Sequence, residues 1–148
     1  MRYPRLPRLL LAFVLTLLPL GLRAQATTDT LANIAAASQA AERWLGLIDN
    51  GLVSESWDSA ATGFQGAVTR AAWTQSVLNA RLAFEPFGER QRIAAKYTTQ
   101  IPNAPPGEYV LLQYRTRVSM ERTVIETVVP VQDGARGWRV SGYFVRPE

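Results

Sequence analysis

Glu126 is the residue whose type and position best suit chemistry. It stands between Ile125 and Thr127 in an otherwise apolar stretch, and strand alternation places it on the face of Val124 and Val128. A carboxylate on such a face is either half of an ion pair or, in a cavity, a general base or a ligand anchor. Because these roles require different neighbours, the adjacent strand decides between them.

The residue opposite Glu126 depends on the length of the preceding hairpin loop. A two-residue loop at positions 120–121 sets Arg115 opposite Glu126, and the same loop one step later sets Arg117 there. An odd-length loop sets Thr116 there instead. A facing arginine lowers the pKa of a carboxylate, whereas a general base needs a raised pKa. An arginine partner therefore favours an ion pair or ligand recognition over catalysis.

Aromatic side chains are the second group with chemical potential, since the chain holds 4 tryptophans and 5 tyrosines. Trp44, Trp57 and Trp73 fall on helical stripes that face inward, so core packing explains them first. Lining of a ligand cavity is the alternative. The predicted ligand-binding residues are Glu126, Arg115, Trp57, Tyr109, Trp138 and Tyr143.

Three functions compete for these residues. The preferred function is non-catalytic binding of a partner protein or of a small apolar ligand. The alternative is a cofactor-free isomerase or dehydratase in which Glu126 or Asp58 is the base and Tyr109 or Tyr143 donates a hydrogen bond. That enzyme requires a carboxylate and a tyrosine that converge on one cavity. The third is a homodimer formed through the open face of a sheet.

Missing residue types exclude several classes of site. The chain has no histidine and no cysteine, which excludes a Ser-His-Asp triad, an imidazole metal ligand and a thiolate nucleophile. It also lacks a glycine-rich phosphate loop. Asp49, Glu55 and Asp58 are close in sequence but are interpreted as cap and surface charges. No metal and no cofactor is therefore expected.

The N-terminus has the three parts of a secretory signal. Arg2, Arg5 and Arg8 precede the apolar run 9–18, and Ala24-Gln25-Ala26 offers small residues for cleavage after Ala24 or after Ala26. The run is too short for a stable membrane anchor. The sequence predicts a cleaved segment, 1–26, and one domain, 27–148, in the periplasm or secreted. Intact Met1 on cytosolic protein would contradict this.

The predicted cleavage changes the charge of the protein. The whole chain has 16 basic and 12 acidic residues, with a net charge of +4. Arg2, Arg5, Arg8 and Arg23 lie before the cut and no acidic residue does, so the remaining domain is neutral overall. A nucleic-acid partner would require a positive surplus, so none is expected.

The periodicity of the chain changes from helical to strand-like at Gly88. Helices are predicted from Leu31 to Gly51, over 54–61 with Ser54 as N-cap, and over 70–82 after an N-cap at Thr69, with a turn at 63–66. Strands are predicted over 90–97, 108–118, 124–131 and 138–145. Arg90, Arg92 and Lys96 are interpreted as a solvated edge. Helices before neighbouring strands predict an α+β fold, in which an antiparallel meander curls around the helices.

Several segments carry a family resemblance: Trp44–Gly51, Ser56-Trp57, Trp73, the proline-rich Ile101–Tyr109, Glu126–Val128 and Gly137–Tyr143. Together they resemble the exported bacterial proteins grouped as domain of unknown function 4019, over nearly the whole chain after the leader. That resemblance implies export and no particular activity. The element order is also similar to the cystatin-like cone of nuclear transport factor 2 and its relatives, which hosts enzymes and scaffolds alike.

Overall fold

The computed structural model describes the backbone of residues 21–148 and the side chains from residue 28 onward. The predicted leader therefore lies mostly outside the described residues, and positions 24 and 26 fall in the first turns of the first helix. Within the described range, none of the helices combines the length and apolar character needed to cross a bilayer.

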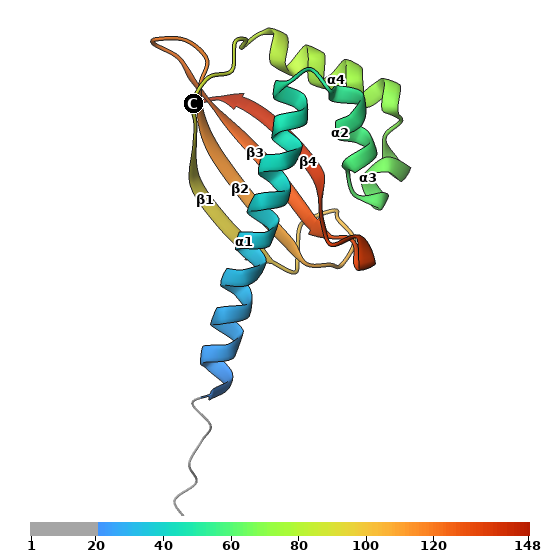
Figure 1. The fold of residues 1–148 in the computed structure, drawn as a ribbon, viewed down its shortest axis with the longest axis vertical. Coiled ribbons are helices and arrows are strands. Elements are labelled where there is room, and N and C mark those ends of the chain that lie inside the picture. Colours follow the sequence, from blue (N-terminus) through green and yellow to red (C-terminus); the bar gives the residue numbers. More distant parts are fainter. Residues whose placement is uncertain (1–20) are drawn as a thin grey trace, which may run out of the picture.

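The described chain is an α+β domain in which helices precede a four-stranded antiparallel sheet, as predicted. The sheet follows chain order, β1-β2-β3-β4, and curls around α1, while α2, α3 and α4 gather beside β4 (Figure 1). The helices are α1 (Gly21–Asp49), α2 (Val53–Ser59), α3 (Thr62–Ala67) and α4 (Arg70–Leu82). The strands are β1 (Arg90–Thr98), β2 (Tyr109–Arg117), β3 (Thr123–Gln132) and β4 (Trp138–Pro147), with the 3-10 turn η1 (Gly134–Arg136) before β4.

Three local predictions about the helices were wrong. Residues 27–30, which precede the predicted start at Leu31, are already helical. The N-cap of α2 is Leu52, not Ser54. The glycine-spaced segment 63–66 lies in α3 because Phe64 packs edge-on against Trp73, with ring centroids 5.1 Å apart. Tertiary packing outweighs the low helix propensity of glycine there.

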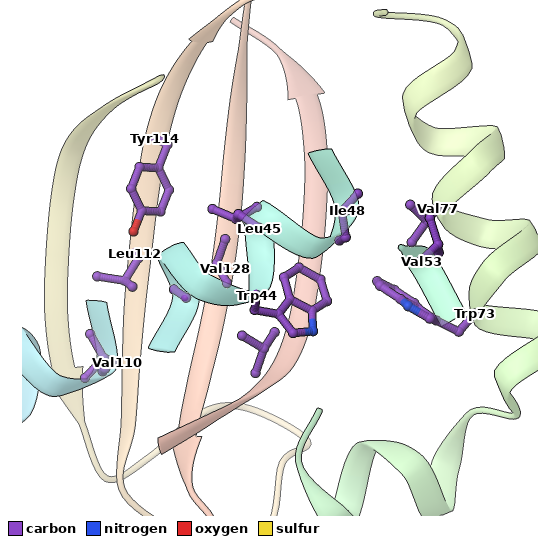
Figure 2. Packing of buried hydrophobic residues seen from close by; sticks show 13 residues of the cluster. Trp44, Leu45, Ile48, Val53, Trp73, Val77, Val110, Leu112, Tyr114 and Val128 are labelled. Atoms are coloured by element: carbon purple, nitrogen blue, oxygen red, sulfur yellow. The ribbon is translucent and has the colours of Figure 1, made fainter. Parts of the chain in front are cut away.

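The core lies between α1 and the concave face of the sheet. The α1 stripe of Trp44, Leu45 and Ile48 is buried against β2 and β3, where Leu112 and Val128 are fully buried (Figure 2). Every fourth or third residue of α1 faces the sheet because this spacing follows the helical turn. The predicted inward position of Trp44 is confirmed, and this packing fixes α1 across β3, the strand that carries Glu126.

Two β-bulges decide which side chains point into the concave face. The β3–β4 register shifts between Val129 and Pro130, so that Ser141 is the extra residue and Tyr143 joins Val140 on the inner face. Pro130 is tolerated in a central strand because the bulge interrupts the ladder where proline has no N–H to donate. A second register shift, between Arg92 and Ala94, likewise changes which side chains of β1 point into the concave face.

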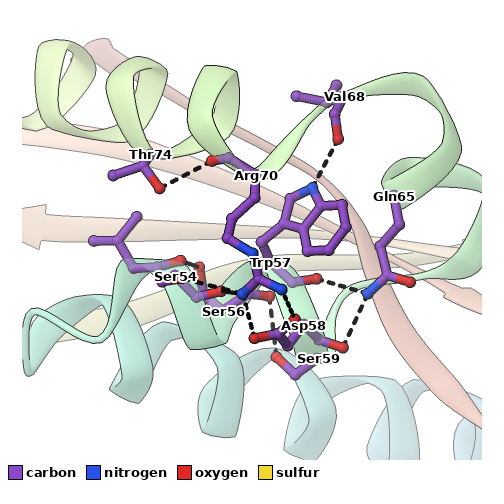
Figure 3. A network of polar contacts seen from close by, with 10 residues as sticks. Ser54, Ser56, Trp57, Asp58, Ser59, Gln65, Val68, Arg70 and Thr74 are labelled. Carbon is purple, nitrogen blue, oxygen red and sulfur yellow. Dashed lines mark hydrogen bonds and ion pairs between the residues drawn. The ribbon is translucent and has the colours of Figure 1, made fainter.

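Trp57 and Asp58 lie in a clamp between α2 and α4, away from Glu126. The Arg70 guanidinium lies 4.8 Å from the centre of the Trp57 ring and pairs with the carboxylate of Asp58, while the Trp57 indole donates to the Val68 carbonyl at 2.7 Å (Figure 3). Because Asp58 and Arg70 are both about half exposed, water screens this pair and it contributes little stability.

Candidate functional site

Glu126 is fully buried and saturated with hydrogen bonds. Its side chain has no exposed surface, and Arg90 donates to it from Nε at 2.6 Å and from Nη2 at 3.2 Å. The hydroxyls of Thr116 and Tyr143 donate at 2.5 Å and 2.6 Å. Both carboxylate oxygens therefore have partners, and neither faces solvent.

The predicted partner of Glu126, Arg115, was wrong. The β2–β3 loop sets Tyr114 opposite Glu126, and Arg115 pairs in the ladder with Ile125. Since side chains alternate along a strand, Arg115 points to the outer face, where it binds Glu148 with Nε to Oε1 at 2.8 Å. The loop closes when Val118 N donates to the Arg122 carbonyl, a register that none of the three predicted loops gives.

The arginine that binds Glu126 comes from the edge strand β1. Arg90 also donates to Asp49 at the end of α1, with Nη1 to Oδ2 at 2.8 Å, and Arg81 of α4 donates to the same carboxylate at 2.7 Å. The interpretation of Arg90 as a solvated edge residue, and that of Asp49 as a cap, were therefore wrong. We call the connected set the Glu126 network: Arg81, Asp49, Arg90, Glu126, Thr116 and Tyr143.

Alternating charges hold the Glu126 network together across α4, α1, β1 and β3. A carboxylate in the last turn of a helix faces the negative end of the helix dipole, which is unfavourable. Burial would also raise the pKa of Asp49, but hydrogen bonds from Arg90 and Arg81 outweigh burial and lower that pKa. Burial raises the pKa of Tyr143, and the charge of Glu126 raises it further, so its hydroxyl stays protonated and donates.

This arrangement suits a network that stabilises the fold better than one that transfers protons. A general base needs a free lone pair within reach of its substrate, and the oxygens of Glu126 are all engaged and buried. Among the described residues, two buried groups of the same region stay without a hydrogen-bond partner: Nε and Nη1 of Arg81, and the hydroxyl of Tyr114. Arg81 also stacks on Phe87 at 3.9 Å.

Asp49 makes the stability of the domain sensitive to acid. Its pKa is lowered in the folded state from an ordinary value of 3.8, so the unfolded chain binds the proton more readily. The contribution of Asp49 is therefore complete above about pH 5 and is lost as the pH falls through 3.8 toward the folded value. Denaturant titrations between pH 7 and pH 2.5 are expected to show this loss. Asp49→Asn should be less stable at pH 7 but less sensitive to acid, and an equally steep loss would contradict the prediction.

Sequence reasoning missed Arg81, Asp49 and Arg90 as members of one site. Two signals pointed to them: Arg81 falls on the inward stripe of its helix with Trp73 and Val77, and Arg90 opens a strand. A charged residue on an apolar stripe requires a buried partner, but nothing local identifies that partner.

Tyr109 and Trp138 lie in two other places. The Tyr109 hydroxyl donates to the Pro105 carbonyl at 2.7 Å and so braces the proline-rich loop. Trp138, at the start of β4, lines a half-open pocket instead. The structure therefore brings together only Glu126 and Tyr143 of the predicted ligand-binding residues.

The pocket at Trp138 lies between α1 and β4 and has a volume of about 240 Å³. Trp44 and Val140, which are 3% and 2% exposed, belong to its lining and to the core. We call it the tryptophan pocket, and its main lining residues are Arg43, Trp44, Leu47, Trp138, Arg139 and Val140. Its volume is below the roughly 300–1,000 Å³ of pockets for drug-sized ligands, so it suits a small molecule.

A larger recess of about 500 Å³ lies at the loop 99–108, and it suits a ligand less well. Its lining includes Thr99, Pro105 and Glu108, which are exposed, and none of the residues around it is buried. A ligand there would keep most of its contact with water, whereas small-molecule sites bury most of the ligand surface.

Comparison with known proteins gives one match. The family model described as "Protein of unknown function (DUF4019)" matches residues 40–143, which is more than half of the chain. That range includes the charged residues of the Glu126 network and the lining of the tryptophan pocket. No curated protein and no solved structure gives a significant match. The likeness to the cystatin-like cone therefore stays a prediction.

Proposed function

The chain belongs to the DUF4019 family, whose description names no activity, and we propose from its geometry that it is a non-catalytic domain that binds a small apolar molecule in the tryptophan pocket. The observation that carries this proposal is that Trp44 and Trp138 both line one recess that reaches the core at Val140. Export from the cytoplasm stays a prediction of the N-terminal sequence.

The environment of the Trp138 side chain supports ligand binding in the tryptophan pocket. Trp44 and Trp73 donate their indole N–H groups to Ser56 atoms, each at 2.9 Å, and Trp57 donates to Val68. The Trp138 indole makes no hydrogen bond with any other described residue, and Trp138 is only half-buried. A half-buried aromatic ring whose indole N–H has no partner is available to stack on an apolar ligand.

The environments of Glu126 and Asp58, the two candidate bases of the alternative enzyme, support a non-catalytic function. Glu126 has no surface to offer a substrate, and Asp58 is exposed and paired with Arg70 on α4. Among the described contacts, no tyrosine lies at Asp58, and the one at Glu126 is Tyr143, which donates to it. The convergence of a free carboxylate and a tyrosine on one cavity, which an isomerase needs, therefore has no counterpart in this geometry.

The four indole N–H signals give a direct test of the proposed function. We expect 2-naphthol, titrated into ¹⁵N-labelled protein, to shift the Trp138 signal most and the Trp44 signal next. The signals of Trp57 and Trp73 should move little, because their rings do not line the pocket. Trp138→Ala should weaken binding about tenfold because the ring stacks on the ligand.

The matched control is Phe144→Ala, which removes another aromatic ring, 63% exposed and outside the tryptophan pocket. Its affinity for 2-naphthol should equal that of the unchanged protein. Equal shifts of all four indoles, equal weakening in both variants, or no shift at saturating probe would each reject the proposed function.

A further inference from the structure

We infer that the tryptophan pocket selects small aromatic molecules that carry an anionic group, with Arg43 and Arg139 as the residues that recognise the anion. This inference rests on the proposed function and adds the chemical class of the ligand. Both arginines belong to the lining of the pocket, Arg43 from α1 and Arg139 from β4. They therefore reach one small recess from two different elements.

Neither arginine has a carboxylate partner in the described part of the chain. The Arg43 side chain makes no hydrogen bond or ion pair there, and the single side-chain bond of Arg139 runs from Nε to the Arg136 carbonyl at 3.1 Å. By contrast, five other arginines each lie within 3.0 Å of a carboxylate oxygen: Arg70, Arg81, Arg90, Arg115 and Arg136. The half-buried Arg139 thus lacks the carboxylate partner that the buried Arg81 and the half-buried Arg90 have, and the exposed Arg43 beside it lacks one too.

The acidic residues nearest in sequence do not neutralise the pocket. Asp133 accepts from Thr62 at 2.9 Å and from Arg136 at 3.0 Å, so η1 and α3 hold it. Glu42 precedes Arg43 on α1, but it makes no ion pair with Arg43 and does not belong to the lining of the pocket. No carboxylate belongs to the lining residues of the pocket. Its local charge is therefore positive although the predicted mature domain is neutral.

The two tryptophans and two arginines of the pocket lining define the chemical class of the ligand. The indoles of Trp44 and Trp138 favour an aromatic body. A guanidinium presents a planar fork of donors that matches a carboxylate or a sulfonate. Because the pocket is small and half-open, about 240 Å³, the anionic group can lie toward Arg43 at the exposed rim while the ring contacts the indoles. Aromatic monocarboxylates are the simplest molecules of this class.

The test compares two probes of the same shape that differ in charge. We expect the full-chain protein to bind 2-naphthoate about tenfold more tightly than 2-naphthamide, because a hydrogen bond to a charged group is worth more than a neutral one. Raising the salt from 0.05 M to 0.5 M should reduce this advantage, because the rim arginines are partly exposed. Calorimetry or the Trp138 indole signal measures both affinities.

Arg43→Gln combined with Arg139→Gln should abolish the preference for 2-naphthoate, so that this variant binds the two probes about equally. The matched control, Arg117→Gln, removes an arginine that is 64% exposed and does not line the pocket, and should keep the preference. Equal affinities for both probes, or a preference that survives the double substitution, would overturn the anion selectivity while the proposed function stands. Failure of both probes to bind would overturn both.

Discussion

Glu126→Gln is expected to lower the free energy of unfolding by about 3 kcal/mol, because it removes one partner of a buried ion pair. The substitution keeps the shape of the side chain but removes the charge that faces Arg90, which is itself only 17% exposed. In the unchanged protein the hydroxyls of Thr116 and Tyr143 donate to the Glu126 carboxylate, and the substitution sets an amide group against them. Few single changes elsewhere on the concave face would disturb as many bonds.

Denaturant unfolding followed by tryptophan fluorescence measures this loss. The matched control is Glu148→Gln, which removes a carboxylate that pairs with Arg115 on the exposed outer face and should leave stability nearly unchanged. Equal stabilities of the two variants would show that burial does not strengthen the Glu126 pairing.

A double variant tests whether Arg90 and Glu126 stabilise the fold as a coupled ion pair or only by packing. Arg90→Met together with Glu126→Leu removes both charges, so the double variant should lose less stability than the two single variants added together. Strict additivity would mean that Arg90 and Glu126 are not coupled. The remaining cost should come from Asp49, which keeps Arg81 but loses Arg90.

The second large effect is expected at Trp44. Trp44→Ala should lower the free energy of unfolding by about 3–5 kcal/mol, the range for deleting a buried large aromatic side chain. Its ring is 3% exposed and lies 5.6 Å from the Trp73 ring and 5.5 Å from the Tyr143 ring, centroid to centroid. Its loss also leaves the buried Ser56 carbonyl without the indole donor.

Trp138→Ala is the comparison for this prediction, because Trp138 is half-buried and makes no indole hydrogen bond with another described residue. It should cost clearly less stability than Trp44→Ala. If the two costs were equal, Trp138 would be a core residue and not an available wall of the pocket. The same pair of variants therefore separates folding from binding.

Prediction from the sequence was most successful for the order of the elements. Period-2 alternation in 108–118 and 124–131 and period-3.6 spacing along α1 are properties of neighbouring residues, and the strands and the core stripe agree with them. Thr69 caps α4 as predicted, accepting from the Ala72 N–H at 3.2 Å. The family match was also predicted from local motifs such as Gly137–Tyr143.

The partners of Glu126 were beyond prediction for a physical reason. The loop at 119–121 has an odd length, which was one of the predicted alternatives, but its register sets Tyr114 and not Thr116 opposite Glu126. One extra residue at Ser141 turns Tyr143 inward. Loop geometry and bulges of this kind are selected by packing of the whole sheet against α1.

The sequence by itself determined the class of the fold, the meander, the helix that fills it and the exclusion of histidine and cysteine chemistry, because each follows from composition or from the periodicity of adjacent residues. Only the tertiary structure decided that Arg90 reaches Glu126 across 36 positions and Asp49 across 41, and that Arg43 meets Arg139 at one recess. Such contacts depend on how the sheet curls around α1 and on which charges that curvature removes from water.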